Sequence, residues 1–265
     1  MKSSRKKGSK KGERKGIFIL PSLFTSASLF GGFYAIIATI QGRYEAAAIA
    51  IFISAVLDGL DGRIARFTRT TSPFGIEYDS LSDLVAFGVA PGILAFKWAL
   101  EPFGRLGWLA AFMYVICGAL RLARFNVQKE KAQGNYFKGM PIPAAACFIA
   151  SLVLFTEALG GEIETKPIII IYLIYILSFL MVSTVDYLSF KRFDVRHRKP
   201  FSVLVSIILI LILIAYKPKI MLFFIAISYT ISGPIITLYR LYGKRSLADK
   251  PVDSISIPNS DKPEL

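Results

Sequence analysis

The sequence predicts an all-α protein that crosses a membrane several times. Hydrophobic residues make up 54% of the 265 positions, and the mean hydropathy of +0.54 is too apolar for one soluble domain of this length. The apolar residues are gathered in segments about as long as a membrane crossing, which takes ~20 residues. The basic residues lie mostly between these segments, as they do in the loops of membrane proteins.

Eight apolar segments are long enough to cross a membrane or nearly so, and each is expected to be a helix. They cover about 17–40, 46–67, 80–100, 106–126, 141–158, 167–188, 201–216 and 219–241. The breaks between them are rich in Gly, Pro and polar residues, as in TTSPFG, QGNYFKGMP and RHRKP. The seventh segment is the shortest, with Pro200 before it and Pro218 after it.

The two ends of the chain are polar. Residues 1–15 hold eight basic residues with Ser and Gly and no apolar face, which predicts a disordered cytoplasmic arm. The apolar stretch that follows is as long as a full crossing, so it is expected to be the first helix and not a signal peptide. Residues 246–265 are expected to be a disordered tail. The Lys and Arg count of the loops predicts that both termini face the cytoplasm, with the protein integral to the cell (inner or plasma) membrane.

The charge balance also bears on partners and chemistry. Lys and Arg number 32 against 18 Asp and Glu, a net charge of +14, and we expect the anionic membrane surface, and no nucleic acid, to be the partner of this charge. Cys117 and Cys147 lie in apolar runs and predict no disulfide and no zinc site. His197 is the only histidine and lies in a basic loop, which argues against a histidine base.

Four acids stand close together in this apolar chain. Asp58 and Asp61 are three residues apart, and Asp79 and Asp83 are four apart, so each pair shares one face of a helix. The Ser72-Pro73 pair predicts a break between the two helices. Antiparallel helices joined by a short turn can face the two pairs toward each other, so the four carboxylates are expected to converge at the cytoplasmic end.

Converging carboxylates at partial membrane depth repel one another and lose hydration unless cations compensate. Ligation by oxygen alone selects a hard divalent ion, Mg²⁺ or Mn²⁺ with Ca²⁺ also possible, and four carboxylates are enough for two ions. Gly62 opens the helix face for a bulky ligand, and Arg66 could pair with a phosphate. The alternative is that the acids are only ion-pair partners of Arg63, Arg66 and Arg69.

The residues around the acids form a recognisable motif. The pattern Asp58-x-x-Asp61-Gly62-x-x-Ala65-Arg66, eight further residues, and Gly75-x-x-x-Asp79-x-x-x-Asp83 resembles the full signature of the CDP-alcohol phosphatidyltransferases. The resemblance implies a six-helix core in a homodimer, with an active site open to the cytoplasm. That catalytic membrane domain would be residues 16–190, and residues 191–245 would be a two-helix membrane extension.

The resemblance also implies roles for single residues. Asp58, Asp61 and Asp79 would hold one metal ion and Asp79 with Asp83 a second, and Asp83 would be the general base. The donor, CDP-diacylglycerol, would be contacted by Gly62, Arg66 and Ser72. The stretch LPSLFT is similar to the family's Pro-Asn-x-x-Thr entry, which adds Ser22 and Thr25 to the donor site, with Ser22 standing where Asn is common.

Two later stretches bear on the acceptor alcohol. Residues 121–126 (RLARFN) and 137–143 (FKGMPIP) resemble those of the membrane-embedded phosphatidylserine synthases within the family. Arg121 and Arg124 could grip a carboxylate, which serine has and inositol and choline lack, and Asn126 is placed in the same serine site. The expected reaction is direct transfer of the phosphatidyl group from CDP-diacylglycerol to L-serine, giving phosphatidylserine and CMP.

Other interpretations remain open at this point. One is that the arginines serve only as positive-inside anchors. Another is that the acceptor is glycerol 3-phosphate or inositol phosphate, or that the donor is an archaeal-type lipid. A cation transporter would place acids along a whole crossing, whereas the later apolar segments contain few.

Overall fold

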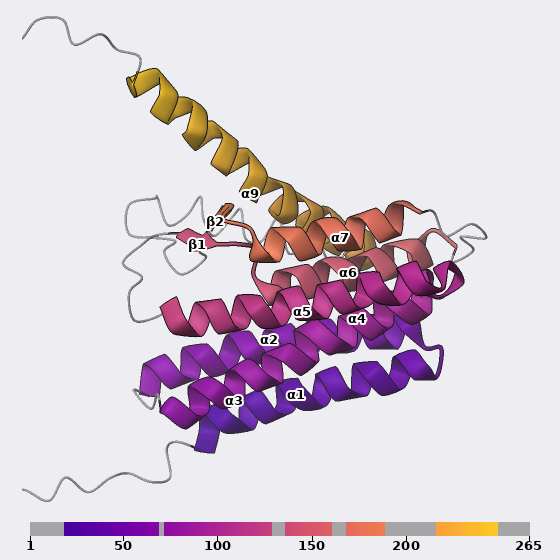
Figure 1. Ribbon diagram of the computed structural model, residues 1–265. Helices are drawn as coiled ribbons and strands as arrows, with labels where there is room; N and C mark the ends of the chain where they lie inside the picture. Colours follow the sequence, from indigo (N-terminus) through magenta and orange to yellow (C-terminus); the bar gives the residue numbers. More distant parts are fainter. Residues whose placement is uncertain (1–18, 69–71, 129–135, 161–167, 189–215, 249–265) are drawn as a thin grey trace, which may run out of the picture.

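A computed structural model describes residues 19–68, 72–128, 136–160, 168–188 and 216–248 (Figure 1). Within these ranges the chain is a bundle of long helices with one short pair of strands. The predicted arm, nearly all of the seventh segment and the tail from residue 249 lie outside the described residues, as does the side chain of Arg66.

The first two helices form an antiparallel pair through small side chains. Helix α1 (Ile19–Ile40) and helix α2 (Tyr44–Thr68) are joined by a turn in which Gly42 has a φ of 75°. Ser28 and Ser54 each donate a hydroxyl hydrogen bond to the other's backbone carbonyl, at 3.1 and 3.0 Å. Small residues of this kind let membrane helices approach closely, and α1 lies along α2 over most of its length.

The third span is longer than the sequence predicted. Helix α3 (Pro73–Asp83), the π-helical segment η1 (Leu84–Val89), helix α4 (Ala90–Ala95), the π-helical segment η2 (Phe96–Leu100) and the 3₁₀ turn η3 (Glu101–Phe103) continue one another from Pro73 to Phe103. The predicted start near residue 80 was wrong. Ser72 is instead the N-cap, its Oγ accepting from the Gly75 N–H at 3.0 Å, and Pro73 occupies the first turn, where its missing N–H costs nothing.

Each π-helical segment precedes a proline. Ala90 N–H reaches the carbonyl of Val85 in η1, and Glu101 N–H reaches that of Phe96 in η2; Pro91 and Pro102 follow and cannot donate. A tyrosine hydroxyl bonds a carbonyl in each segment. Tyr114 donates to Phe87 at 3.0 Å, and Tyr44 donates to Lys97 at 3.2 Å.

The remaining core consists of three helices and a strand pair: α5 (Arg105–Gln128), β1 (Tyr136–Lys138), α6 (Ile142–Ala158), α7 (Ile169–Val182) and β2 (Asp186–Leu188). The sixth segment was predicted to stay helical to residue 188, which was wrong. Ser183 is extended, with φ −61° and ψ 168°, and β2 then pairs antiparallel with β1, Lys138 opposite Asp186.

The last helix, α9 (Pro218–Ala248), occupies the place of the eighth predicted segment. It packs on α6 and β2, and its C-terminal part extends away from the bundle (Figure 1). Ion pairs hold it at two levels, Lys219 to Glu45 at 2.7 Å and Arg240 to Asp186 at 2.8 Å.

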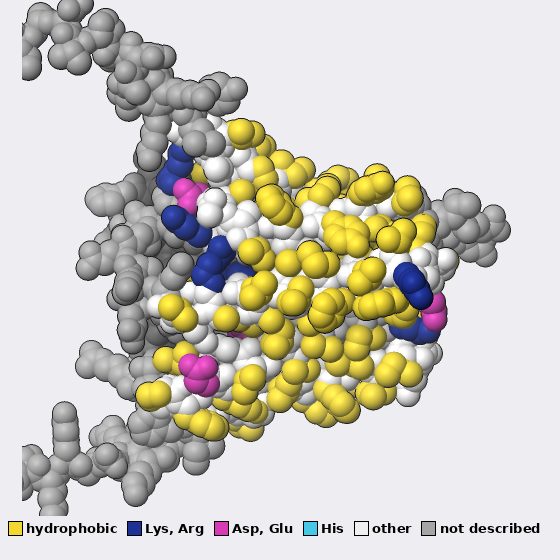
Figure 2. Space-filling view, in the orientation of Figure 1, with side chains coloured by type: hydrophobic (Ala, Val, Ile, Leu, Met, Phe, Trp, Pro, Cys, Tyr) yellow, Lys and Arg dark blue, Asp and Glu magenta, His cyan; other side chains and the backbone are white. Residues whose placement is uncertain are grey.

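The distribution of side chains fits a membrane setting. Four described helices are long and apolar enough to cross, namely Pro21–Ile40, Pro73–Phe103, Arg105–Val127 and Pro218–Arg240, while Ile142–Ala158 and Ile169–Val182 are shorter and apolar. Figure 2 shows hydrophobic side chains over the middle of the visible face and charged ones at its two ends. The predicted class, an all-α polytopic membrane protein, is confirmed.

Candidate active site

The structure brings the predicted acids together between α2 and α3. Asp58, Asp61 and Asp79 each offer a carboxylate oxygen, and these oxygens lie within 4.8 Å of one another. Asp83 lies beside them, with its carboxyl group in hydrogen-bond contact with that of Asp58 and in electrostatic contact with Asp79. Asp61 is only 5% exposed and Asp58 and Asp79 are half-buried, so the cluster is built into the bundle.

This donor set fits a divalent cation. Carboxylate oxygens this close repel one another strongly, and their burial removes the water that would screen them. Asp58, Asp61 and Asp79 offer only carboxylate oxygens as ligands, a donor set that suits Mg²⁺, Mn²⁺ or Ca²⁺. A bound cation is therefore the physical arrangement that these four side chains are best suited to.

Helix α1 supports the cluster from the side. The Thr25 hydroxyl donates to Oδ2 of Asp61 at 2.8 Å and also lies 3.1 Å from the carbonyl of Pro21. The Ser82 hydroxyl, one residue before Asp83, donates to the carbonyl of Thr25 at 3.1 Å. Thr25 thus connects both acid-bearing helices, a contact that the sequence did not suggest.

The other described residues predicted for the donor site differ in their exposure and in their contacts. Gly62 is exposed, and a Cβ added there would meet nothing within 4 Å, so the helix face beside Asp61 is open. Ser22 is half-buried on α1. Ser72 uses its hydroxyl to cap α3.

Arg121 of α5 places a buried positive charge next to the acids. It is 9% exposed, and its Nε has no hydrogen-bond partner within the described part of the chain. Its electrostatic neighbours include Asp83, Tyr229 and Arg124, and its guanidinium lies 5.9 Å from the centre of the Phe125 ring. Buried guanidinium groups usually have acceptors, so an unused donor here suits an anionic ligand.

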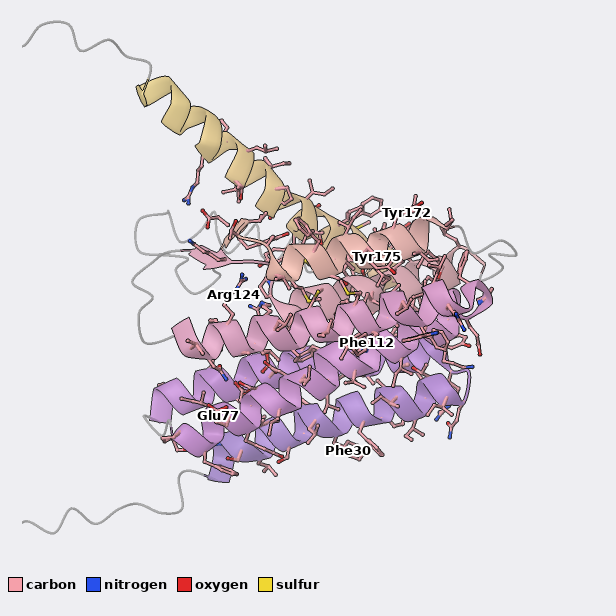
Figure 3. All side chains as sticks on the ribbon, viewed as in Figure 1. Phe30, Glu77, Phe112, Arg124, Tyr172 and Tyr175 are labelled. Carbon is pink, nitrogen blue, oxygen red and sulfur yellow. The ribbon has the colours of Figure 1, made fainter. Side chains whose placement is uncertain are left out.

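Arg124 and Asn126 use their side chains within the protein. The Arg124 guanidinium donates to the carbonyl of Val182 at 2.7 Å and to those of Ser183 and Lys138 at 3.2 Å, so it caps the end of α7 and ties it to β1. Asn126 donates to Oγ of Ser80, between the two acids of α3, at 2.9 Å. Figure 3 shows Arg124 near β1, at the same end of the bundle as Glu77 of α3.

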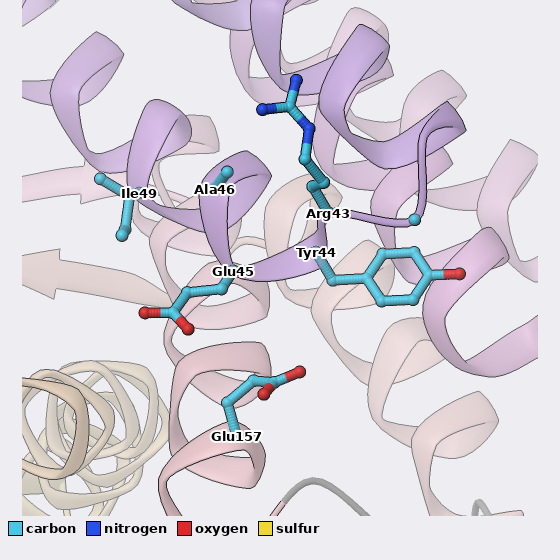
Figure 4. A pocket seen from close by; sticks show the side chains of 7 residues that line it. Arg43, Tyr44, Glu45, Ala46, Ile49 and Glu157 are labelled. Atoms are coloured by element: carbon cyan, nitrogen blue, oxygen red, sulfur yellow. The ribbon is translucent and has the colours of Figure 1, made fainter.

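A cavity of about 440 Å³ lies at the other end of α2 (Figure 4). It is lined by Gly42, Arg43, Tyr44, Glu45, Ala46, Ile49 and Glu157. An apolar groove of about 320 Å³ shares Ile49 with it and lies between α2, α6 and α9. Neither hollow contains a predicted site residue, so the candidate site is defined by its carboxylates and by Arg121.

A helical membrane bundle in which two neighbouring spans bring four acids together has the architecture that the sequence motif implied. The family model described as CDP-alcohol phosphatidyltransferase matches residues 18–182, and the chain belongs to this family of phosphotransferase enzymes. The resemblance drawn from the motif is confirmed.

Similar curated proteins narrow the class further. The CDP-diacylglycerol–serine O-phosphatidyltransferase of Helicobacter pylori is 41% identical over 179 residues, which cover 66% of this chain and 74% of that protein. The Bacillus subtilis protein of the same name is 37% identical, over 65% of this chain and 92% of its own length. The archaetidylserine synthase of Methanothermobacter thermautotrophicus is 37% identical, over 63% of this chain and 69% of its own.

Proposed function

We propose that this protein transfers the phosphatidyl group of CDP-diacylglycerol to the hydroxyl of L-serine, giving phosphatidylserine and CMP. The observation that carries the proposal is the meeting of carboxylates from α2 and α3 within 4.8 Å, in a chain of this family. The names of the similar bacterial proteins support serine as the acceptor.

The reaction is a substitution at phosphorus. The serine oxygen forms a bond to the phosphorus of the phosphatidyl group, the bond from that phosphorus to the CMP oxygen breaks, and CMP leaves with the electron pair. The serine hydroxyl loses its proton, and Asp83 is the proposed acceptor of that proton, because a hydroxyl is a weak nucleophile at neutral pH.

The proposed metal site consists of Asp58, Asp61, Asp79 and Asp83. It would hold two divalent ions, Mg²⁺ or Mn²⁺, with Ca²⁺ as the alternative. Bound ions would neutralise the donor's pyrophosphate and the charge that develops on CMP. Thr25 orients Asp61 through its 2.8 Å hydrogen bond. Open space at Gly62 leaves room for the nucleotide, and Arg66, Ser22 and Ser72 are proposed to line the same donor site.

Arg121 is the proposed anchor of the serine carboxylate. Its buried guanidinium has a donor without a partner in the described part of the chain, and its neighbour Asp83 is the proposed base. A carboxylate held there would bring the serine hydroxyl toward that base. Arg124 and Asn126 are proposed to support the serine site by fixing α7, β1 and α3 around it.

One similar protein points to an alternative lipid donor. The archaetidylserine synthase is nearly as similar as the bacterial proteins, so an archaeal-type lipid donor is the alternative to CDP-diacylglycerol. The chemistry at phosphorus would be the same. We also propose that the site opens to the cytoplasm, because the sequence places more Lys and Arg on that side, and that the protein acts as a homodimer in the cell membrane.

The test is a transfer assay on purified protein with Mn²⁺ or Mg²⁺. Radiolabelled serine should enter lipid with an equal amount of CMP released, and chelation should stop both. Glycerol 3-phosphate and inositol phosphate serve as competing acceptors, and CDP-archaeol as the competing donor. CMP release with another acceptor but not with serine would overturn the proposed acceptor.

A further inference from the structure

The η1 segment begins directly after Asp83 and is fixed by contacts from two neighbouring helices. From α1, Gly32 packs so closely that a Cβ there would lie 2.5 Å from Cα of Ala86. From α5, the fully buried Tyr114 donates its hydroxyl to the carbonyl of Phe87 at 3.0 Å.

The hydrogen bond from Tyr114 to the Phe87 carbonyl is explained by the proline at position 91. In an α-helix the N–H of residue 91 would bond the carbonyl of Phe87, but residue 91 is proline and has no N–H. The Tyr114 hydroxyl stands in for this absent donor. It therefore satisfies a buried carbonyl in the turn where the helix changes from π to α geometry.

Helix geometry at this point decides where the acids of α3 face. A π-turn holds one residue more than an α-turn, so its gain or loss rotates everything before it by about 100° relative to the rest of the helix. Asp79 and Asp83 both lie before η1, whereas α4 lies after it and is buried in the core.

We propose that Tyr114 is a positioning residue for the carboxylate cluster. Through Phe87 it holds the π-turn that aims Asp79 and Asp83 at Asp58 and Asp61, without touching metal or substrate itself. The inference rests on the proposed function, since it assigns Tyr114 a role in the same metal site.

The chain contains a matched control for this role. Tyr44 makes the same kind of bond to the carbonyl of Lys97 in η2, at the other end of the same span and far along it from Asp83. Tyr44→Phe removes the same hydroxyl from a bond that is only partly buried, whereas the Tyr114 bond is fully buried. If stability alone were responsible, Mn²⁺ affinity would follow thermal stability in both variants.

The experiment measures Mn²⁺ binding to the full chain in detergent, without donor or serine, by the electron paramagnetic resonance signal of free Mn²⁺. Because Tyr114→Phe removes a buried hydrogen bond, the variant is expected to have a Kd for Mn²⁺ about five- to thirty-fold higher than that of the wild type. The turnover number should fall, while the serine KM stays within about two-fold of wild type. Tyr44→Phe should leave Mn²⁺ affinity and turnover unchanged, with thermal unfolding of both variants compared in parallel.

Wild-type Mn²⁺ affinity in Tyr114→Phe, or an equal loss in Tyr44→Phe, would overturn the inference. A wild type that binds Mn²⁺ but releases no CMP with serine would refute the proposed acceptor, and the Mn²⁺ comparison would still decide the role of Tyr114. A wild type that binds no Mn²⁺ would refute the metal site and this inference with it.

Discussion

Replacing Thr25 by valine tests the support of the metal site from α1. The substitution keeps the side chain's shape but removes the hydroxyl that donates to Oδ2 of Asp61 at 2.8 Å. Both residues are 5% exposed, so water does not readily replace the lost donor. A hydrogen bond to a charged group contributes ~1.5–3 kcal/mol, which corresponds to a loss of about ten- to hundred-fold in Mn²⁺ affinity. Outer partners of metal ligands have effects of about this size.

The assay is Mn²⁺ binding to purified protein, followed by CMP release as a function of Mn²⁺ concentration. Thr39→Val is the matched control, because Thr39 is buried in the same helix and its hydroxyl donates to the backbone carbonyl of Ala35 at 2.7 Å, within that helix. Thr25→Ser keeps the hydroxyl and should retain most of the affinity. The reasoning fails if Thr25→Val binds Mn²⁺ as wild type does while Asp61→Asn does not bind it.

Three further substitutions test other parts of the site. Asp83→Asn should abolish CMP release while the protein still folds and binds donor, so near-normal turnover would remove the base assignment. Arg121→Lys keeps the charge but loses the planar fork, and the serine KM should rise about ten-fold or more with the donor KM unchanged; an unchanged serine KM would contradict the anchor. Gly32→Ala forces a Cβ against Ala86 and should cost ~1–3 kcal/mol in thermal unfolding, whereas Gly59→Ala, with open space, should not; equal melting curves would argue against the packing.

The parts of the site that lie within a few residues of each other were predictable from the sequence. Asp58 with Asp61 and Asp79 with Asp83 share helix faces through the 3.6-residue period, and repulsion among converging acids pointed to a cation. The order of the described helices, and the limits of α1, α2, α5 and α6 to within about two residues, also followed from hydropathy. Segment length is a direct consequence of bilayer thickness, which makes this signal strong.

The contacts between distant residues were not predictable. Thr25 and Asp61 are 36 positions apart, and nothing in their spacing marks them as partners. Arg124 carries a charge that suits a carboxylate ligand, yet its donors go to backbone carbonyls at the end of α7. Local signals were also ambiguous: the Ser72-Pro73 pair predicts a break between helices, and Ser followed by Pro is equally the start of a helix.

The two ion pairs of α9 restrict how the bundle can adapt to its lipid surroundings. From Lys219 to Arg240 a straight helix rises roughly 32 Å at 1.5 Å per residue, close to the ~30 Å hydrocarbon thickness of a bilayer. One pair fastens α9 to the start of α2 and the other fastens it to β2, so sliding α9 along its axis would break both at once. Each pair is partly exposed and contributes ~0–1 kcal/mol, so in a thicker or thinner bilayer the two pairs together favour tilting of the whole bundle or deformation of the adjacent lipid over sliding of α9.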